Sequence, residues 1–179
     1  MLRDIRHPMD MLTRRQVGGL IGGAVVISRL PVARADGESR ALFSIARSTN
    51  QNVVRYAARL RGRDLDSAQP IEAYWLMLAE DGRREELSWA ERKLAYGFAA
   101  SAVASDRCQL RLVAFKQRVV TVERAPLGFR ALVSIKGRRA VLQRIFVQVS
   151  TGALLPRVQH VDLYGTTLDG SAIGERIHA

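Results

Sequence analysis

From residue 42 onward, apolar and polar residues alternate along most of the chain with the two-residue period of β-strands. Turn-forming residues such as Gly, Asn, Asp and Pro separate the alternating segments from one another. In the second segment, for example, Val54, Tyr56 and Ala58 fall on one face, while Arg55 and Arg59 fall on the other. The segments predicted to be strands are 42–47, 52–61, 71–79, 96–103, 109–115, 118–123, 129–135, 140–149 and 158–164.

Two local motifs interrupt this strand pattern. Ser88, followed three residues later by Glu91, matches a capping box, and this motif predicts one short helix from Trp89 to Leu94. The sequence Lys136-Gly137-Arg138-Arg139 lies between two predicted strands and is typical of a tight hairpin, with Gly137 at the position that needs a positive φ.

Eight or nine short strands without the spacing of βαβ units favour an antiparallel meander. Such a chain buries its apolar face and protects its strand edges by closing on itself or by packing two sheets together. We therefore expect a mainly β domain, either an antiparallel β-sandwich or a closed β-barrel of about eight strands, with one short helix. The pattern leaves the choice between barrel and sandwich open.

The first 35 residues have a different composition. Arg14 and Arg15 precede a short glycine-containing apolar run, and Ala33 and Ala35 are the small residues that a signal peptidase accepts. Paired arginines before a weakly apolar run are typical of twin-arginine export. The run is shorter than the roughly 20 apolar residues that a membrane-spanning helix needs, which disfavours a stable membrane anchor.

These features predict a cleaved twin-arginine-type signal peptide over residues 1–35 and a single β-domain over residues 36–179. The partners expected on this basis are the twin-arginine export machinery and signal peptidase, and the expected location is periplasmic or secreted.

The chain is basic. It has 28 Lys and Arg residues against 17 Asp and Glu, and its formal net charge is +11. Residues 1–35 hold six of the basic and two of the acidic residues, so the remainder carries +7. Its basic residues are scattered, which disfavours nucleic acid as a partner. Cys108 is the only cysteine, so no intramolecular disulfide forms, and its place in an alternating run predicts a buried structural thiol.

Motifs for catalysis or cofactor binding are not found in the sequence. It has no nucleophile elbow, no phosphate-binding glycine loop, no dinucleotide fingerprint and no metal-ligand cluster, so we predict no catalytic residues, no metal site and no cofactor. The alternative is a hydrolase acting on envelope material. Its candidate acid–base groups are Glu85, Glu86, Glu91, His160 and Asp162.

Polar and aromatic residues suggest binding instead. Aromatic rings that converge at one mouth of a barrel can stack a sugar or hold a cation. The competing interpretation places Tyr74 and Trp75 on opposite faces of a strand and makes the asparagines part of an Asx turn. Our leading hypothesis is a non-enzymatic binding module for a small molecule, glycan or envelope component, and an interaction or scaffold protein is a further alternative. The candidate contacts are Arg47, Asn50, Asn52, Tyr74 and Tyr96.

Several blocks of residues, in order along the chain, resemble one known family. They are Phe43 with Ile45-Ala46-Arg47-Ser48-x-Asn50-x-Asn52-x-Val54-x-Tyr56, Pro70-Ile71-x-x-Tyr74-Trp75, Asp81-Gly82-Arg83-Arg84-Glu85-Glu86-Leu87-Ser88, Arg92-Lys93-x-Ala95-Tyr96-Gly97, and Tyr164-Gly165-Thr166-Thr167. On these blocks the chain is similar to domain-of-unknown-function family 4833, which occurs in exported bacterial proteins, from about residue 42 to residue 177. The resemblance implies one self-contained domain and transfers no catalytic residues.

Overall fold

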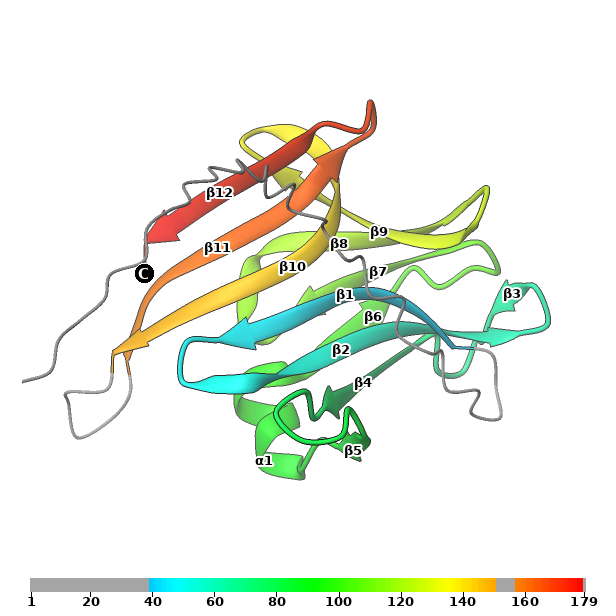
Figure 1. Cartoon of the computed structure of the whole chain (residues 1–179). Helices are drawn as coiled ribbons and strands as arrows, with labels where there is room; N and C mark the ends of the chain where they lie inside the picture. The colour runs from blue at the N-terminus through cyan, green and yellow to red at the C-terminus, as the bar shows by residue number, and fades with distance from the viewer. Residues whose placement is uncertain (1–38, 151–156, 179) are drawn as a thin grey trace, which may run out of the picture. The chain divides into compact units, whose positions relative to one another are not determined.

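The structure is a computed structural model that describes residues 39–150 and 157–178, and these residues form twelve strands and one short helical segment (Figure 1). The elements are β1 (Ser39–Arg47), β2 (Asn50–Arg61), β3 (Asp64–Leu65), β4 (Ile71–Leu76), β5 (Arg84–Glu86), α1 (Trp89–Glu91), η1 (Arg92–Tyr96), β6 (Phe98–Ser101), β7 (Arg107–Leu112), β8 (Phe115–Ala125), β9 (Gly128–Ile135), β10 (Arg138–Ser150), β11 (Arg157–Thr167) and β12 (Ala172–His178). The signal peptide and the domain boundary predicted at residue 35 lie outside the described residues.

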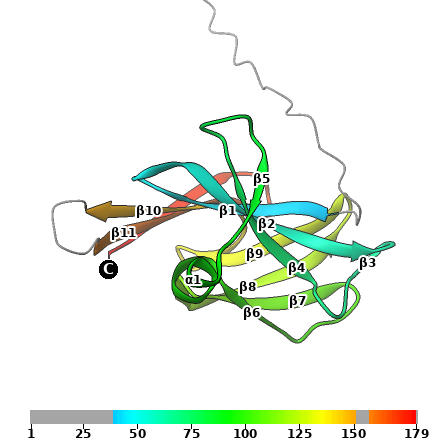
Figure 2. The same cartoon turned by 90° about the horizontal axis from the view of Figure 1, so that it is seen from below.

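The sheet divides into two branches at β10. Residues 138–141 of this long strand pair antiparallel with β9, whereas residues 144–147 pair parallel with β1. The opposite edge of β10 pairs with β11, which in turn pairs with β12. One branch continues from β1 through β2 and β4 to β5, and the other continues from β9 through β8 and β7 to β6. The two branches lie over each other as two layers (Figure 2).

Our prediction of a closed barrel or simple sandwich of about eight strands was therefore wrong, although the mainly β class is confirmed. The molecule has one curled, open sheet of twelve strands, and within the described sheet its terminal strands β5 and β6 do not pair with each other. The parallel pairing of β1 with β10 also departs from a pure antiparallel meander. Because β10 has 13 residues, it is long enough to pair with a different strand along each half.

Local patterns were predicted more accurately than pairing. Val54, Tyr56 and Ala58 are completely buried on one face of β2, as the alternation indicated. The hairpin between β9 and β10 turns at Lys136 and Gly137, whose φ values of 49° and 74° give the two positive-φ positions of a type I′ turn. Ser88 and Glu91 form the predicted capping box. The helical segment, however, continues through Tyr96 with a π-helical turn, so β6 begins only at Phe98.

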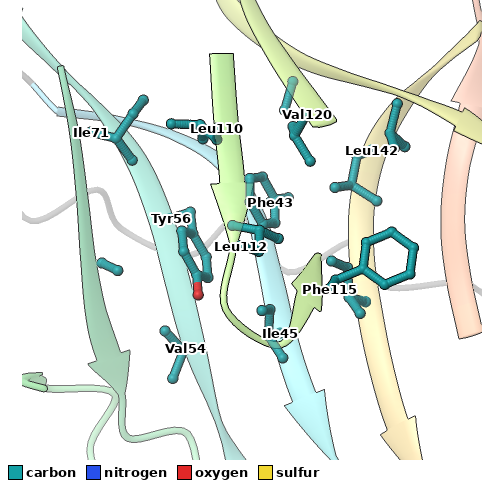
Figure 3. Packing of buried hydrophobic residues seen from close by; sticks show 14 of the residues in the cluster. Phe43, Ile45, Val54, Tyr56, Ile71, Leu110, Leu112, Phe115, Val120 and Leu142 are labelled. Carbon is teal, nitrogen blue, oxygen red and sulfur yellow. The ribbon is translucent and has the colours of Figure 1, made fainter. Parts of the chain in front are cut away.

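An apolar core fills the space between the two branches (Figure 3). Phe43 of β1 stacks on Tyr56 of β2 with ring centroids 4.6 Å apart, and Leu110 and Leu112 reach this pair from β7 in the other layer. Fully burying an aliphatic or aromatic side chain of this size stabilises the folded state by about 1.5–3 kcal/mol. The core therefore joins the two layers.

The gap between the free edges of the sheet is bridged by segments other than paired strands. At one end of β6, the Tyr56 hydroxyl donates a 2.6 Å hydrogen bond to the Tyr96 carbonyl and fixes η1 to β2. At the other end, the Leu65 amide of β3 donates a 2.8 Å hydrogen bond to the Ser105 carbonyl. Among the described residues, no helix has the length and apolar character needed to cross a membrane.

Candidate functional site

A pocket of about 400 Å³ opens between the β1–β2 hairpin and the helical segment α1–η1. It lies at the end of the inner face of the sheet, where β1 and β4 meet the segment that bridges the free edges. The residues that determine its chemistry are Arg47, Asn50, Trp75, Glu91, Leu94 and Tyr96.

Arg47 is the last residue of β1, and the neighbouring turn holds it in place. The register of the β1–β2 ladder shifts between Ala46 and Arg47, so that Arg47 pairs with Asn50 across a short turn. The Ser48 amide donates a 3.1 Å hydrogen bond to the Val147 carbonyl of β10, and the Ser48 hydroxyl accepts one of 3.0 Å from the Val149 amide. The turn is therefore anchored to the central strand of the fold, which fixes the backbone from which Arg47 extends.

The Arg47 guanidinium has unused hydrogen-bonding capacity. Its carbon lies 4.7 Å from the centre of the Tyr96 ring, within the range of a cation–π interaction. Its Nε is buried and has no hydrogen-bond partner, and no carboxylate of the described residues forms an ion pair with this arginine. Burying a charged donor without a partner is costly, so an anionic group placed in the pocket would gain a strong interaction.

Glu91, in contrast, is surrounded by donors. The Trp75 indole donates to its Oε1 at 3.0 Å, and the amide and hydroxyl of Ser88 both donate to its Oε2 at 2.8 Å. Burial raises the pKa of Glu91, but these hydrogen bonds and the charge of Arg47 outweigh burial and lower it overall. The carboxylate is therefore ionised at neutral pH, and its oxygens are already occupied by protein donors.

Tyr96 completes the wall beside Arg47. Its ring meets Trp75 edge to face, with centroids 5.1 Å apart. Burial raises the pKa of Tyr96, and Glu91 adds to this shift while Arg47 opposes it, so the phenol stays neutral at physiological pH. The pocket thus combines the Arg47 cation, the ionised Glu91 carboxylate, a neutral phenol and an indole with the apolar side chain of Leu94, which is 76% exposed at the rim.

The structure brings together three of the five candidate contacts, namely Arg47, Asn50 and Tyr96. The Asn50 side-chain oxygen accepts a 2.8 Å hydrogen bond from the Asn52 amide, which is the Asx turn of the competing interpretation. The Asn52 side-chain oxygen accepts from the Ala79 amide at 2.9 Å and ties the hairpin to the loop after β4. Both asparagines therefore have structural bonds.

Tyr74 lies outside the pocket. It pairs with Arg55 on the outer face of the sheet, and the Arg84 guanidinium lies 3.8 Å from the centre of its ring. The neighbouring Trp75 was not among our candidate contacts, yet it lines the pocket together with Leu94. The alternation of β4 could have identified Trp75, because it places Trp75 on the inner face together with Ile71 and Ala73.

The acid–base candidates of the hydrolase alternative are divided among β5, α1 and β11, and of these only Glu91 lines the pocket. Glu86 of β5 pairs with Arg92 at 2.6 Å. On β11, Asp162 receives two 2.8 Å hydrogen bonds from Arg176, and His160 lies 3.6 Å from the same carboxylate. Two carboxylates facing each other across the pocket, as glycoside hydrolysis needs, are not found in the described part of the chain.

Further candidates for reactive groups are the thiol of Cys108 and the potential metal ligands of the described residues. Cys108 is buried, and burial raises the pKa of its thiol to about 11, which agrees with the predicted structural role. Over residues 39–150 and 157–178, no group of three or more His, Cys, Asp or Glu side chains has the arrangement of a metal site.

Together, these observations define a mainly β domain with a pocket beside η1, in which Arg47 pairs with no carboxylate of the described residues. The chain belongs to the family described as Domain of unknown function (DUF4833), whose model matches residues 43–176. No curated protein and no solved structure matches the chain.

Proposed function

We propose that this domain is a non-enzymatic binding module that holds a small ligand with a carboxylate in the pocket beside η1. The observation that carries the proposal is the Arg47 guanidinium, which is stacked on Tyr96, has a buried Nε without a hydrogen-bond partner and pairs with no carboxylate of the described residues. A carboxylate ligand would supply two acceptor oxygens in the geometry that a guanidinium binds best.

The remaining walls suit a sugar acid. A pocket of about 400 Å³ is in the size range of small-molecule sites. The partly buried Trp75 ring offers an apolar surface against which the C–H groups of a sugar ring can pack. The Tyr96 ring is buried and Arg47 covers one of its faces, but Tyr96 lines the pocket and its neutral phenol can hydrogen-bond with a sugar hydroxyl. Glu91 keeps its own donors and supports Trp75 rather than contacting the ligand.

The test uses tryptophan fluorescence, because the chain has two tryptophans and one lines the pocket. Trp89 is 72% exposed and is replaced by Phe, so that Trp75 alone reports binding. The W89F protein is titrated with glucuronate and, separately, with glucose, which has the same ring without the carboxylate. We expect a saturable change with glucuronate and a much smaller one with glucose.

Two further variants in the W89F background locate the binding. Arg47→Met should weaken glucuronate binding about tenfold or more, because hydrogen bonds to charged groups contribute roughly 1.5–3 kcal/mol. Arg111→Met removes the same charge from an exposed position of β7 and should leave binding unchanged. Equal responses to glucose and glucuronate, or an Arg47→Met protein that binds as well as its parent, would reject the proposal.

We also propose that the protein is exported to the periplasm or secreted, on the basis of Arg14-Arg15 and Ala33-x-Ala35. Intact mass spectrometry of protein purified natively from the periplasmic fraction should give a chain that starts at Asp36. Replacing Arg14 and Arg15 with Lys should keep the protein in the cytoplasm with its first 35 residues attached. An unprocessed chain in the periplasm, or export that survives both substitutions, would contradict the proposal.

A further inference from the structure

A second surface of interest is the outer face of the sheet across β4, β2, β1, β10 and β11. The strand register places five residues side by side in one row across these strands. The row reads Tyr74, Arg55, Ser44, Arg144 and Tyr164. It has an arginine on each side of a central serine and a tyrosine at each end. The pocket beside η1 lies at the end of the opposite, inner face, so this row is independent of the proposed function.

Neither arginine of the row pairs with a carboxylate among the described residues. The Arg55 Nε is buried and has no hydrogen-bond partner. The Arg144 guanidinium lies over Tyr164, 4.7 Å from the ring centre, and 5.9 Å from the centre of Phe146. Two like charges held on one sheet face without counter-charges attract an anionic ligand.

The acidic groups beside the two ends of this row are paired with arginines, and one of them, Asp162, also accepts a 3.3 Å hydrogen bond from the Tyr164 hydroxyl. Asp162 accepts two hydrogen bonds from Arg176, and Glu86, opposite Tyr74, pairs with Arg92 at 2.6 Å. Arg84, which covers one face of Tyr74, is held by Glu72 through two 3.0 Å hydrogen bonds. The positive charge of Arg55 and Arg144 therefore dominates the centre of the face.

An apolar strip runs parallel to the row. Its members are partly exposed and pair with one another across the same strands, and they are Leu76, Val53, Ala46 and Phe146. A ligand that lies along the row can therefore place carboxylates on the arginines and apolar C–H surface on the strip.

We propose that this face binds a chain of an acidic polysaccharide, with uronic-acid carboxylates on Arg55 and Arg144 and sugar rings against Tyr74 and Tyr164. Strands in a sheet are about 4.8 Å apart, so the two arginines start roughly 10 Å apart and the two tyrosines roughly 19 Å apart. A row of this length exceeds a single sugar and suits an extended chain lying across the strands. A nucleic acid would demand a longer run of cations to match its continuous phosphates.

The test is affinity electrophoresis of the full chain in native gels that contain polygalacturonate, with neutral dextran as the reference polymer. We expect polygalacturonate to retard the protein and dextran to leave its mobility unchanged. The variant with both Arg55→Met and Arg144→Met should bind polygalacturonate about tenfold or more weakly, because it loses two charge-assisted contacts. Tyr164→Ala should also weaken binding by removing a stacking surface.

A matched control removes two charges elsewhere, through Arg111→Met on β7 and Arg107→Met on the same strand, and should keep polygalacturonate binding. Arg47→Met should keep it as well, because Arg47 lies in the separate pocket. Three results would overturn the proposal: equal loss in the β7 control, unchanged binding after the Arg55 and Arg144 substitutions, or stronger arginine-dependent binding to single-stranded DNA than to polygalacturonate. Far-ultraviolet circular dichroism and thermal unfolding check that each variant is folded.

Discussion

The hydroxyl of Tyr56 donates a 2.6 Å hydrogen bond to the backbone carbonyl of Tyr96, and this bond connects the core of the sheet to the wall of the pocket. Tyr56 is completely buried in β2, while Tyr96 ends the π-helical turn that bridges the free edges of the sheet. Burial raises the pKa of Tyr56, so its phenol remains a neutral donor. The position of Tyr96, and with it the stacking partner of Arg47, therefore depends on a residue far from it in the chain.

Tyr56→Phe should lower the free energy of unfolding by about 1–3 kcal/mol, because it leaves a buried carbonyl oxygen without its donor. Urea denaturation followed by circular dichroism measures the change. Tyr74→Phe is the control, since Tyr74 lies on the outer face and its ring interaction with Arg84 does not need the hydroxyl. A loss of the same size in both variants would show that the bond to Tyr96 has no special role.

Gly97→Ala should be destabilising through a steric effect. The φ of Gly97 is −69°, so its backbone conformation suits any residue, but a Cβ there would overlap the Arg92 carbonyl at the start of η1. Relieving such an overlap requires a backbone shift, and overpacking of this kind costs roughly 1–3 kcal/mol.

The matched control for Gly97→Ala is Gly174→Ala in β12, where the nearest atom to an added Cβ is the Leu163 carbonyl at 3.4 Å. This is an ordinary contact, so the control should unfold within about 0.5 kcal/mol of the parent. Thermal and urea unfolding of both variants give the comparison. A Gly97→Ala protein as stable as the control would mean that η1 shifts freely.

The sequence predicted the strands whose alternation is strong. In β7, Cys108, Leu110 and Leu112 are buried and the residues between them are exposed, as expected for a strand with one face in the core. In β12, Ile173 and Ile177 pack against the core, but a glycine and two charged residues separate them, so the polar tail gave no clear strand signal. Alternation reports which residues face the core only where the pattern is continuous.

Strand pairing was predictable at the β9–β10 hairpin, where the turn residues around Gly137 indicated it, but not at β1 and β10. The two halves of β10 have similar patterns, yet one pairs with β9 and the other with β1. β9 is joined to β10 by a turn, whereas β1 is distant from β10 in sequence. The periodicity within β10 contains no information about which strand pairs with either half. The branching at β10, which decides between a curled open sheet and a barrel or sandwich, is a property of these long-range contacts.

The candidate site was predictable where its residues lie close together in the sequence. Arg47 and Asn50 flank one turn, and the turn residues between them marked that region of the chain. Tyr74 was grouped with Tyr96, but the structure does not bring the two side chains to the same pocket, because Ala73 and Trp75 face the interior and Tyr74 lies on the outer face. Tyr96 reaches the pocket through the π-helical turn, whose length the capping box at Ser88 does not specify.

Cys108 should be unreactive in the folded protein. It is buried, and burial raises the pKa of its thiol to about 11, so little thiolate forms near neutral pH. With 5,5′-dithiobis(2-nitrobenzoate) at pH 8, the native chain should react far more slowly than the chain unfolded in guanidinium chloride, which should release one equivalent of chromophore. In a C108A background, Arg107→Cys at the exposed neighbouring position should react rapidly without denaturant. Rapid reaction of native Cys108 would mean that β7 opens readily.

Glu175 should make stability depend on pH in the acid range. Arg118 donates to both of its carboxylate oxygens, at 2.7 and 2.6 Å, and the Lys136 amide donates at 2.6 Å. The hydrogen bonds from Arg118, followed by that from Lys136, lower the pKa of Glu175 to about 2. The unfolded chain has an ordinary glutamate pKa and binds a proton at higher pH. The stability contributed by Glu175 is therefore present above about pH 4.5 and is lost as the pH falls toward 2.

Glu175→Gln should reduce this loss, because unfolding of the variant should take up about one proton fewer between pH 4.5 and 2. Urea midpoints measured across this range should fall less steeply with decreasing pH in the variant than in the parent. Asp162 also has a lowered pKa, chiefly through its hydrogen bonds from Arg176, so part of the acid dependence should remain in the variant. Glu80→Gln is the control for removal of one acidic charge, because the ion pair of Glu80 with Arg83 is exposed and such pairs contribute little to stability. Identical profiles for Glu175→Gln and the parent would show that the bonds from Arg118 and Lys136 do not persist in solution.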